Sequence, residues 1–178
     1  MPAQQAPRYV NPNKQRGLSY RACARLAGSP LALWLSQKRI WSTVVWRIDP
    51  VLLRLTRGRV GTGLLLPTAL LQTRGARTGQ LRSNAVIYFH DDERVIVFAS
   101  KAGRPGNPAW YYNMRANPDV LFGGQPFRAE IVEGQVERDR LWQLADRVFP
   151  AFATYRARAA VAGRQIPVIQ LRPSSSRL

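Results

Sequence analysis

The sequence predicts an α+β domain built on a small antiparallel β-barrel, with helices inserted between the hairpins and at the N-terminus. About six β-rich runs lie between residues 64 and 171, and short turns join most of them in pairs, as in β-hairpins. Helical patterns fall between hairpins and do not alternate with single strands, which excludes a doubly wound parallel sheet. A closed barrel leaves no exposed strand edges, and its mouth can hold a cofactor.

The expected strands are joined by turns with typical sequences. Asp91-Asp92-Glu93 would connect the second and third strands, and Gly123-Gly124-Gln125 the fourth and fifth. Pro67 indicates an edge or a bulge in the first strand, because proline cannot donate a ladder hydrogen bond. The strands are expected at residues 64–73, 82–89, 94–100, 120–122, 127–132 and 166–171.

Three helices are expected within the barrel domain, at residues 108–117, 137–149 and 152–160. Pro108 would be the first position of the first helix, and Asn117-Pro118 would end it. The helix at 137–149 has apolar residues at helical spacing that would face the core. These are Leu141, Leu144, Ala145 and Val148.

Residues 1–59 are expected to form an N-terminal arm and an amphipathic helix, 60–173 the barrel domain, and 174–178 a tail. The arm shows no periodicity and lacks the apolar run of a secretory signal. Ser29 and Pro30 are typical of a helix start. Beyond them tryptophans and leucines recur at helical spacing among arginines. This helix either packs on the domain or lies in an anionic membrane interface, and both interpretations stay open.

The composition restricts the chemistry. The chain has 27 basic and 10 acidic residues and a formal net charge of +17, which indicates an anionic partner. Cys23 is the only cysteine and His90 the only histidine, so an internal disulfide is impossible. A multi-histidine metal site and a histidine-dependent triad are nearly excluded for the same reason. The expected localisation is the cytoplasm.

Two basic loops carry the candidate binding residues. The first covers 73–80, with Arg82 just beyond it, and the second covers 99–110 and opens a helix. Both combine small residues, which let backbone N–H groups approach a ligand, with cations and hydroxyls that suit anionic oxygen. Neither loop has the Walker pattern or the dinucleotide fingerprint. We expect the two loops to lie side by side and to hold a phosphate-bearing cofactor.

The residues of this stretch also match a family pattern. They are, in chain order, Thr73, Gly75, Arg77, Thr78, Gly79 and Arg82; Ala99, Ser100, Lys101 and Gly103; Asn107, Pro108, Trp110, Tyr111 and Asn113; and Ala116, Asn117 and Pro118. In this pattern the chain resembles the deazaflavin (coenzyme F420)-dependent nitroreductases and quinone reductases of actinobacteria. Those proteins are small split β-barrels related to flavin-binding oxidoreductases.

The resemblance implies that reduced coenzyme F420 binds across the two loops, with FMN as the alternative cofactor. The cofactor carries an anionic phospholactyl-oligoglutamate tail, for which Arg104 is a further candidate cation. The reaction would be hydride transfer to a quinone-like or nitro acceptor, oriented by the protein. The residues expected to bind the cofactor are Arg74, Ala76, Arg77, Thr78, Arg82, Ser100, Lys101, Ala102, Gly103, Pro108, Ala109 and Trp110.

Further expectations concern the acceptor. Phe149, Phe152 and Tyr155 would line the substrate pocket, with Tyr155 as the candidate catalytic proton donor. The related nitro-drug reductase has tyrosines where this chain has the two phenylalanines, which implies a more apolar pocket here. Ala102 stands where the family pattern has glycine, and alanine fits there unless the position needs a positive φ.

Two other functions remain open. A carrier of the same fold would bind the cofactor or a lipid without turnover. Nucleic-acid binding rests only on charge and scattered aromatic residues, without a recognisable motif. For the enzyme, the basic N-terminal helix would bring the site to the inner face of the cell membrane, where quinones partition. The oligomeric state and the acceptor stay open.

Overall fold

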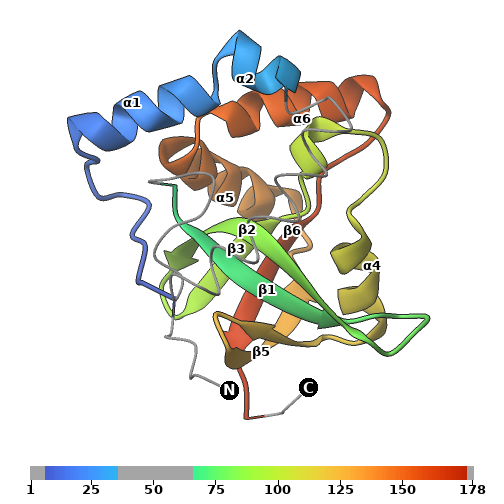
Figure 1. The fold of residues 1–178 in the computed structure, drawn as a ribbon. Coiled ribbons are helices and arrows are strands. Elements are labelled where there is room, and N and C mark those ends of the chain that lie inside the picture. Colours follow the sequence, from blue (N-terminus) through green and yellow to red (C-terminus); the bar gives the residue numbers. More distant parts are fainter. Residues whose placement is uncertain (1–6, 36–65, 176–178) are drawn as a thin grey trace.

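The computed structural model describes residues 7–35 and 66–175 (Figure 1). Within these ranges, antiparallel strands close into a barrel in the order β1-β2-β3-β6-β5-β4. The barrel predicted from the hairpin pattern is therefore confirmed. The strands are β1 Thr68–Arg74, β2 Leu81–Asp91, β3 Arg94–Phe98, β4 Asp119–Phe122, β5 Gln125–Ile131 and β6 Val168–Pro173.

The hairpin turns fix the register of the strands. Asp91 pairs with Arg94 across the β2–β3 turn, and Phe122 pairs with Gln125 across the β4–β5 turn. Gly123 and Gly124 both have positive φ, as a two-residue turn between twisted strands requires. The barrel closes because β1 pairs with β4 as well as β2, while β6 lies between β3 and β5.

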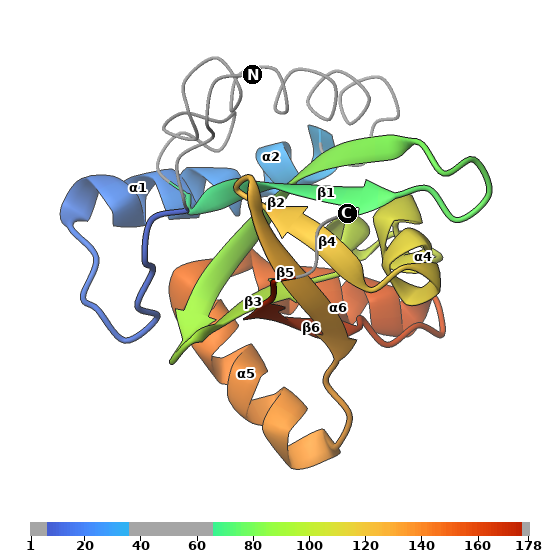
Figure 2. The same cartoon turned by 90° about the horizontal axis from the view of Figure 1, so that it is seen from below.

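The helices gather mainly on one side of the barrel. Figure 1 shows α1, α2, α5 and α6 together on that side, whereas α4 lies beside the β1–β2 hairpin. The view from below shows α4 next to the end of the same hairpin (Figure 2). The helices are α1 Leu18–Ala27, α2 Pro30–Leu35, the 3₁₀ turn η1 Lys101–Gly103, α4 Ala109–Ala116, α5 Gln135–Val148 and α6 Ala151–Val161.

Helix α5 covers the core as its sequence pattern predicts. Its buried residues include the four expected ones and Trp142. Trp142 joins Phe98 and Phe152 in an aromatic cluster, with ring centroids 4.2 Å and 5.8 Å from that of Trp142. Burial of these large apolar side chains makes the main contribution to the free energy that holds α5 and α6 on the barrel.

An ion-pair network fastens α5 to the β2–β3 hairpin. The Asp91 carboxylate, which is 10% exposed, accepts hydrogen bonds from Arg140 and Arg94 at 2.6 Å each. Glu137 of α5 pairs with the same two arginines. The hydrogen bonds from Arg140 and then Arg94 lower the pKa of Asp91, so the carboxylate remains charged at neutral pH.

Residues 7–17, before α1, pack on the barrel, although the sequence predicts a loose arm. Val10 is buried; its N–H donates to His90 Nδ1 (3.0 Å), and its carbonyl accepts from the His90 N–H (2.8 Å). The Tyr88 hydroxyl donates to the Arg8 carbonyl. This part of the arm is held by polar groups of β2, which lie about eighty residues further along the chain. No local pattern reveals such partners.

The N-terminal helices differ in part from expectation. Helix α1 was not predicted, because its sequence is rich in alanine and has few large apolar side chains to mark a core-facing side. The start of α2 at Pro30 is as predicted, with Ser29 Oγ accepting a hydrogen bond from the Ala32 N–H at 3.2 Å. The rest of the predicted amphipathic helix lies outside the described residues. So does the expected boundary, at residue 59, between the N-terminal segment and the barrel domain.

Candidate functional site

The β1–β2 loop is a closed turn attached to α4. The Gly75 N–H donates to the Gln80 carbonyl at 2.9 Å, and the Gly79 N–H to the Gly75 carbonyl at 2.8 Å. Asn113 of α4 then bridges the loop. Its Oδ1 accepts from the Ala76 N–H at 3.1 Å, and its Nδ2 donates to the buried Thr73 hydroxyl at 3.2 Å. The loop is therefore positioned by α4 as well as by its own strands.

The second loop contains three consecutive residues with left-handed φ. Lys101, Ala102 and Gly103 have φ of 49°, 53° and 76°, and they follow Ser100 in the right-handed region. A right-handed residue followed by a left-handed one turns successive backbone N–H groups into one concavity, the anion-binding arrangement called a nest. This segment thus has the backbone geometry expected of a phosphate site.

Helix α4 connects the two loops. The second loop leads into α4, and the first is hydrogen-bonded to Asn113 within it. Pro108 has an extended conformation and precedes the helix, so α4 begins at Ala109, one residue later than predicted. Pro108 and Trp110 are buried, whereas Ala109 is exposed at the helix start. Both loops are therefore attached to the same short helix, the first by hydrogen bonds and the second by chain connection.

The loops carry positive charge without internal compensation. Neither contains an acidic residue. Arg74, Arg77, Arg82 and Lys101 form no ion pair with any residue in the described parts of the chain. Thr78, like Arg77, is exposed in the first loop. Such cations and hydroxyls fit a multiply anionic ligand.

The predicted pocket residues occupy different environments. Phe149 and Phe152 are each 3% exposed and belong to the aromatic cluster of the core. Tyr155 is partly exposed and packs against both rings. Burial raises the pKa of Tyr155, so its phenol keeps its proton at neutral pH. Its hydroxyl forms no hydrogen bond with the described residues. That these three side chains line an acceptor pocket stays a prediction.

Sequence reasoning missed Arg164, which holds the second loop. Its guanidinium donates to the carbonyls of Ala99 (3.0 Å) and Ser100 (2.6 Å). It also donates to Asn107 Oδ1 at 2.7 Å. These partners lie 57 to 65 residues earlier in the chain, so no local pattern indicates the contact. Asn113 belongs to the quoted family pattern and could have been named from it.

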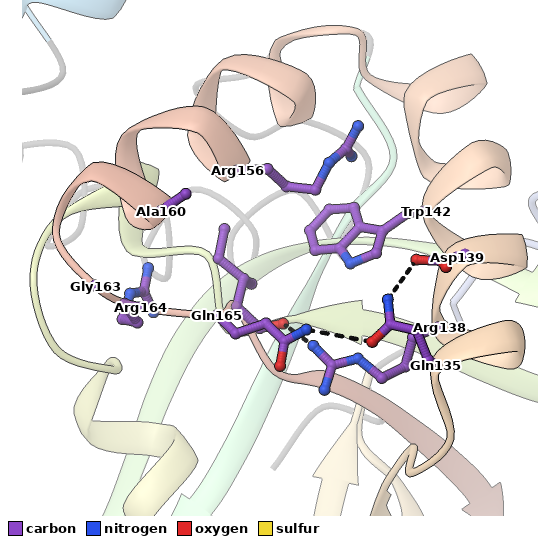
Figure 3. Close-up of a pocket in the computed structure, with 10 residues that line it drawn as sticks. Gln135, Arg138, Asp139, Trp142, Arg156, Ala160, Gly163, Arg164 and Gln165 are labelled. Atoms are coloured by element: carbon purple, nitrogen blue, oxygen red, sulfur yellow. Dashed lines mark hydrogen bonds between the residues drawn. The ribbon is translucent and has the colours of Figure 1, made fainter.

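A pocket of about 440 Å³ lies between α5 and the second half of α6 with the segment that follows it (Figure 3). It contains none of the predicted site residues. Arg164 is the side chain that this pocket shares with the second loop. Its lining consists of Gln135, Arg138, Asp139, Trp142, Arg156, Ala160, Gly163, Arg164, Gln165 and Ile166.

Comparison with known proteins agrees with the geometry of the loops. The sequence model of the F420H(2)-dependent quinone reductase family matches residues 45–173. The chain belongs to this family. An F420H(2)-dependent quinone reductase of Mycobacterium tuberculosis is 34% identical over 133 residues, which cover 70% of this chain and 87% of that protein.

Solved structures support the same assignment. An F420-H2-dependent reductase shares 32% identity and a TM-score of 0.51, covering 60% of this chain and 94% of the other. A second structure, described as a domain-swapped dimer, shares 29% identity and a TM-score of 0.54, covering 71% of this chain and 97% of the other.

Membership makes this protein an oxidoreductase, and the cofactor of its family is coenzyme F420. The residues present fit that cofactor. The nest at Ser100–Gly103 and the cations of both loops suit its phosphate and carboxylate groups. FMN, the alternative considered from the sequence, is not the cofactor named for this family.

We predict that Ala102→Gly stabilises the fold by up to about 1.5 kcal/mol. A left-handed residue that has a Cβ costs roughly 1–2 kcal/mol, and the greater entropy loss of glycine offsets roughly 0.5–1 kcal/mol of the gain. Urea unfolding measures the difference. Ala76→Gly is the matched control, because Ala76 is an exposed loop alanine without positive φ. The free energy of unfolding of this control should fall by about 0.4–1 kcal/mol. An equal decrease in the free energy of unfolding of both variants would contradict the left-handed conformation of Ala102.

Proposed function

We propose that this enzyme transfers a hydride from reduced coenzyme F420 to a quinone-like acceptor. The observation that carries the proposal is the left-handed turn at Lys101–Gly103, which includes a basic side chain and is joined through α4 to a second basic loop. A phosphate-bearing cofactor can be held there by backbone N–H groups and by two sets of basic side chains.

Different residues would bind different parts of the cofactor. Arg77 and Thr78 from the first loop and Lys101 from the second would hold the anionic part of the cofactor. The start of α4, at Pro108, Ala109 and Trp110, would lie against its ring system. Trp110 is buried, so it would support this contact from beneath, while Ala109 presents the exposed surface.

Tyr155 is the candidate proton donor. Bound in its reduced form, coenzyme F420 supplies a hydride, and a quinone then needs a proton to become a quinol. A protonated phenol that makes no hydrogen bond with the described residues can donate to an acceptor oxygen. Tyr155 also lies next to the second loop, since a Cβ on Gly103 would be 2.7 Å from its carbonyl oxygen. The surrounding phenylalanines favour an apolar, quinone-like acceptor.

Lys101→Ala and Arg77→Ala should each weaken binding of coenzyme F420 by about three- to tenfold, because each removes a charge-assisted contact to an anionic oxygen. Titration followed by cofactor fluorescence measures this. The control is Lys14→Ala, which removes the same charge from the segment before α1, on the other side of the molecule (Figure 1). Unchanged affinity in both loop variants would show that the cofactor binds elsewhere.

Turnover distinguishes the enzyme from a carrier. The protein should catalyse oxidation of reduced coenzyme F420 by menadione or menaquinone, and it should not transfer electrons from NADPH. Binding of the cofactor without turnover on any quinone would favour a carrier of the same fold.

Tyr155→Phe should lower kcat by roughly tenfold or more, because the variant keeps the ring and its packing but loses the transferable proton. Steady-state kinetics with menadione measure kcat, and direct titration should give unchanged affinity for coenzyme F420. A kcat equal to that of the wild type would remove Tyr155 from the proton transfer.

We further propose that α1 and α2 bring the enzyme to an anionic membrane surface. Leu18, Leu26 and Leu31 are 82%, 69% and 66% exposed, and α1 also carries exposed Arg21 and Arg25. Exposed leucines beside arginines suit the interface of an anionic bilayer. Within residues 7–35 and 66–175, no helix has the length and apolar character needed to cross a membrane.

The protein should therefore float with vesicles that contain phosphatidylglycerol and remain unbound to pure phosphatidylcholine. The double variant Leu26→Asp/Leu31→Asp should lose flotation, because two carboxylates replace inserted apolar groups and are repelled by anionic lipid. Circular dichroism checks that it stays folded. Flotation equal to that of the wild type would exclude this surface as the membrane contact.

A further inference from the structure

Arg164 holds both ends of the second loop from outside it. Its guanidinium reaches the carbonyls of Ala99 and Ser100 at the start of the loop and Asn107 at its end, with donor–acceptor distances of 2.6–3.0 Å. Hydrogen bonds from a charged donor are about twice as strong as neutral ones. Three of them on one rigid, planar group fix the spacing between the two ends of the loop.

The position of Arg164 is set by the way α6 ends. Gly163 has φ of 64°, and its N–H donates to the Ala160 carbonyl at 2.9 Å. The Arg164 N–H donates to the Ala159 carbonyl at 2.8 Å. This pair of bonds around a left-handed glycine is a Schellman motif, which ends the helix and redirects the chain. It places Arg164 directly after a helix end that is anchored by the fully buried Ala159.

Helix α6 and the second loop are also in direct contact. A Cβ on Gly103 would lie 2.7 Å from the Tyr155 carbonyl oxygen and 2.8 Å from the Arg158 Cβ. Only glycine allows this approach. The left-handed segment is therefore held against α6 at Gly103 and fastened to the end of α6 through Arg164.

The two carbonyls bound by Arg164 belong to peptide groups whose N–H groups face the other way. In a trans peptide the C=O and the N–H point in opposite directions, so holding the Ala99 and Ser100 carbonyls directs the Ser100 and Lys101 N–H groups away from Arg164. Neither N–H donates to an atom of the described residues. A cation on the carbonyl also polarises the peptide and strengthens its N–H as a donor.

We propose that Arg164 is a positioning residue for the cofactor: by holding these carbonyls, it aims the Ser100 and Lys101 N–H groups at the phosphate of coenzyme F420. The inference rests on the proposed function, because it needs the second loop to be the phosphate site. Burial lowers the pKa of Arg164, yet guanidinium groups stay charged in proteins, so the interaction persists across physiological pH.

The test compares two ligands in the full-length protein: coenzyme F420, and the same deazaflavin lacking the phosphate tail. Arg164→Ala should weaken binding of coenzyme F420 by about tenfold, the effect of one lost charge-assisted hydrogen bond. Affinity for the tail-less deazaflavin should stay the same. An equal loss for both ligands would show that Arg164 only supports the fold, and would overturn the proposal.

Chemical rescue gives a second readout. Arg164 lines the pocket of about 440 Å³ shown in Figure 3, so added guanidinium ion has a route to the vacated position. Millimolar guanidinium should restore the affinity of Arg164→Ala for coenzyme F420 and leave the wild type unchanged. Arg164→Lys keeps the charge but not the fork of donors, so it should show the same selective loss even if the alanine variant folds poorly.

Arg156→Ala is the matched control. Arg156 lies on α6 and lines the same pocket as Arg164, but it pairs with Asp146 and covers Trp142. It should lower the melting temperature without changing the affinity for either ligand. If Lys101→Ala weakens binding and neither Arg164 variant does, the positioning role is wrong. If Lys101→Ala also has no effect, the proposed site itself is wrong.

Discussion

The site depends on a short piece of backbone that is held in an unfavourable conformation. Three successive residues after Ser100 have left-handed φ, and two of them, Lys101 and Ala102, carry a Cβ. Such residues persist only where their surroundings fix them. Here the fixing contacts come from α6, which touches Gly103, and from Arg164, which binds the carbonyls just before the turn. The strain is consistent with a backbone arranged for a ligand.

The rest of the fold can be understood as support for this arrangement. The closed barrel supplies β1 and β3, whose ends give rise to the two loops. Aromatic packing around Trp142 and the Asp91 ion network hold α5, and α5 in turn packs against α6. Because α6 both contacts and anchors the second loop, the helical layer positions the backbone of the cofactor site.

The sequence predicted most of the fold because the relevant signals are local. Period-two runs, turn residues such as Gly123-Gly124 and the apolar face of α5 all reflect near neighbours in the chain, and each appears in the structure. Helix α4 and its adjoining loops were placed to within a residue. Two features were not predicted. One is the order of residues 7–17, which comes from contacts with Tyr88 and His90, and the other is the role of Arg164. Both depend on contacts between residues far apart in the chain.

Amide chemical shifts test the central claim most directly. When coenzyme F420 is added to the protein, we expect the largest changes at the backbone amides of Ser100, Lys101 and Ala102, with further changes at Arg77 and Thr78. These are the N–H groups and loop residues that would meet the phosphate. Saturable shifts confined to the pocket beside Trp142 and Arg138, with both loops unchanged, would contradict the assignment of the cofactor site.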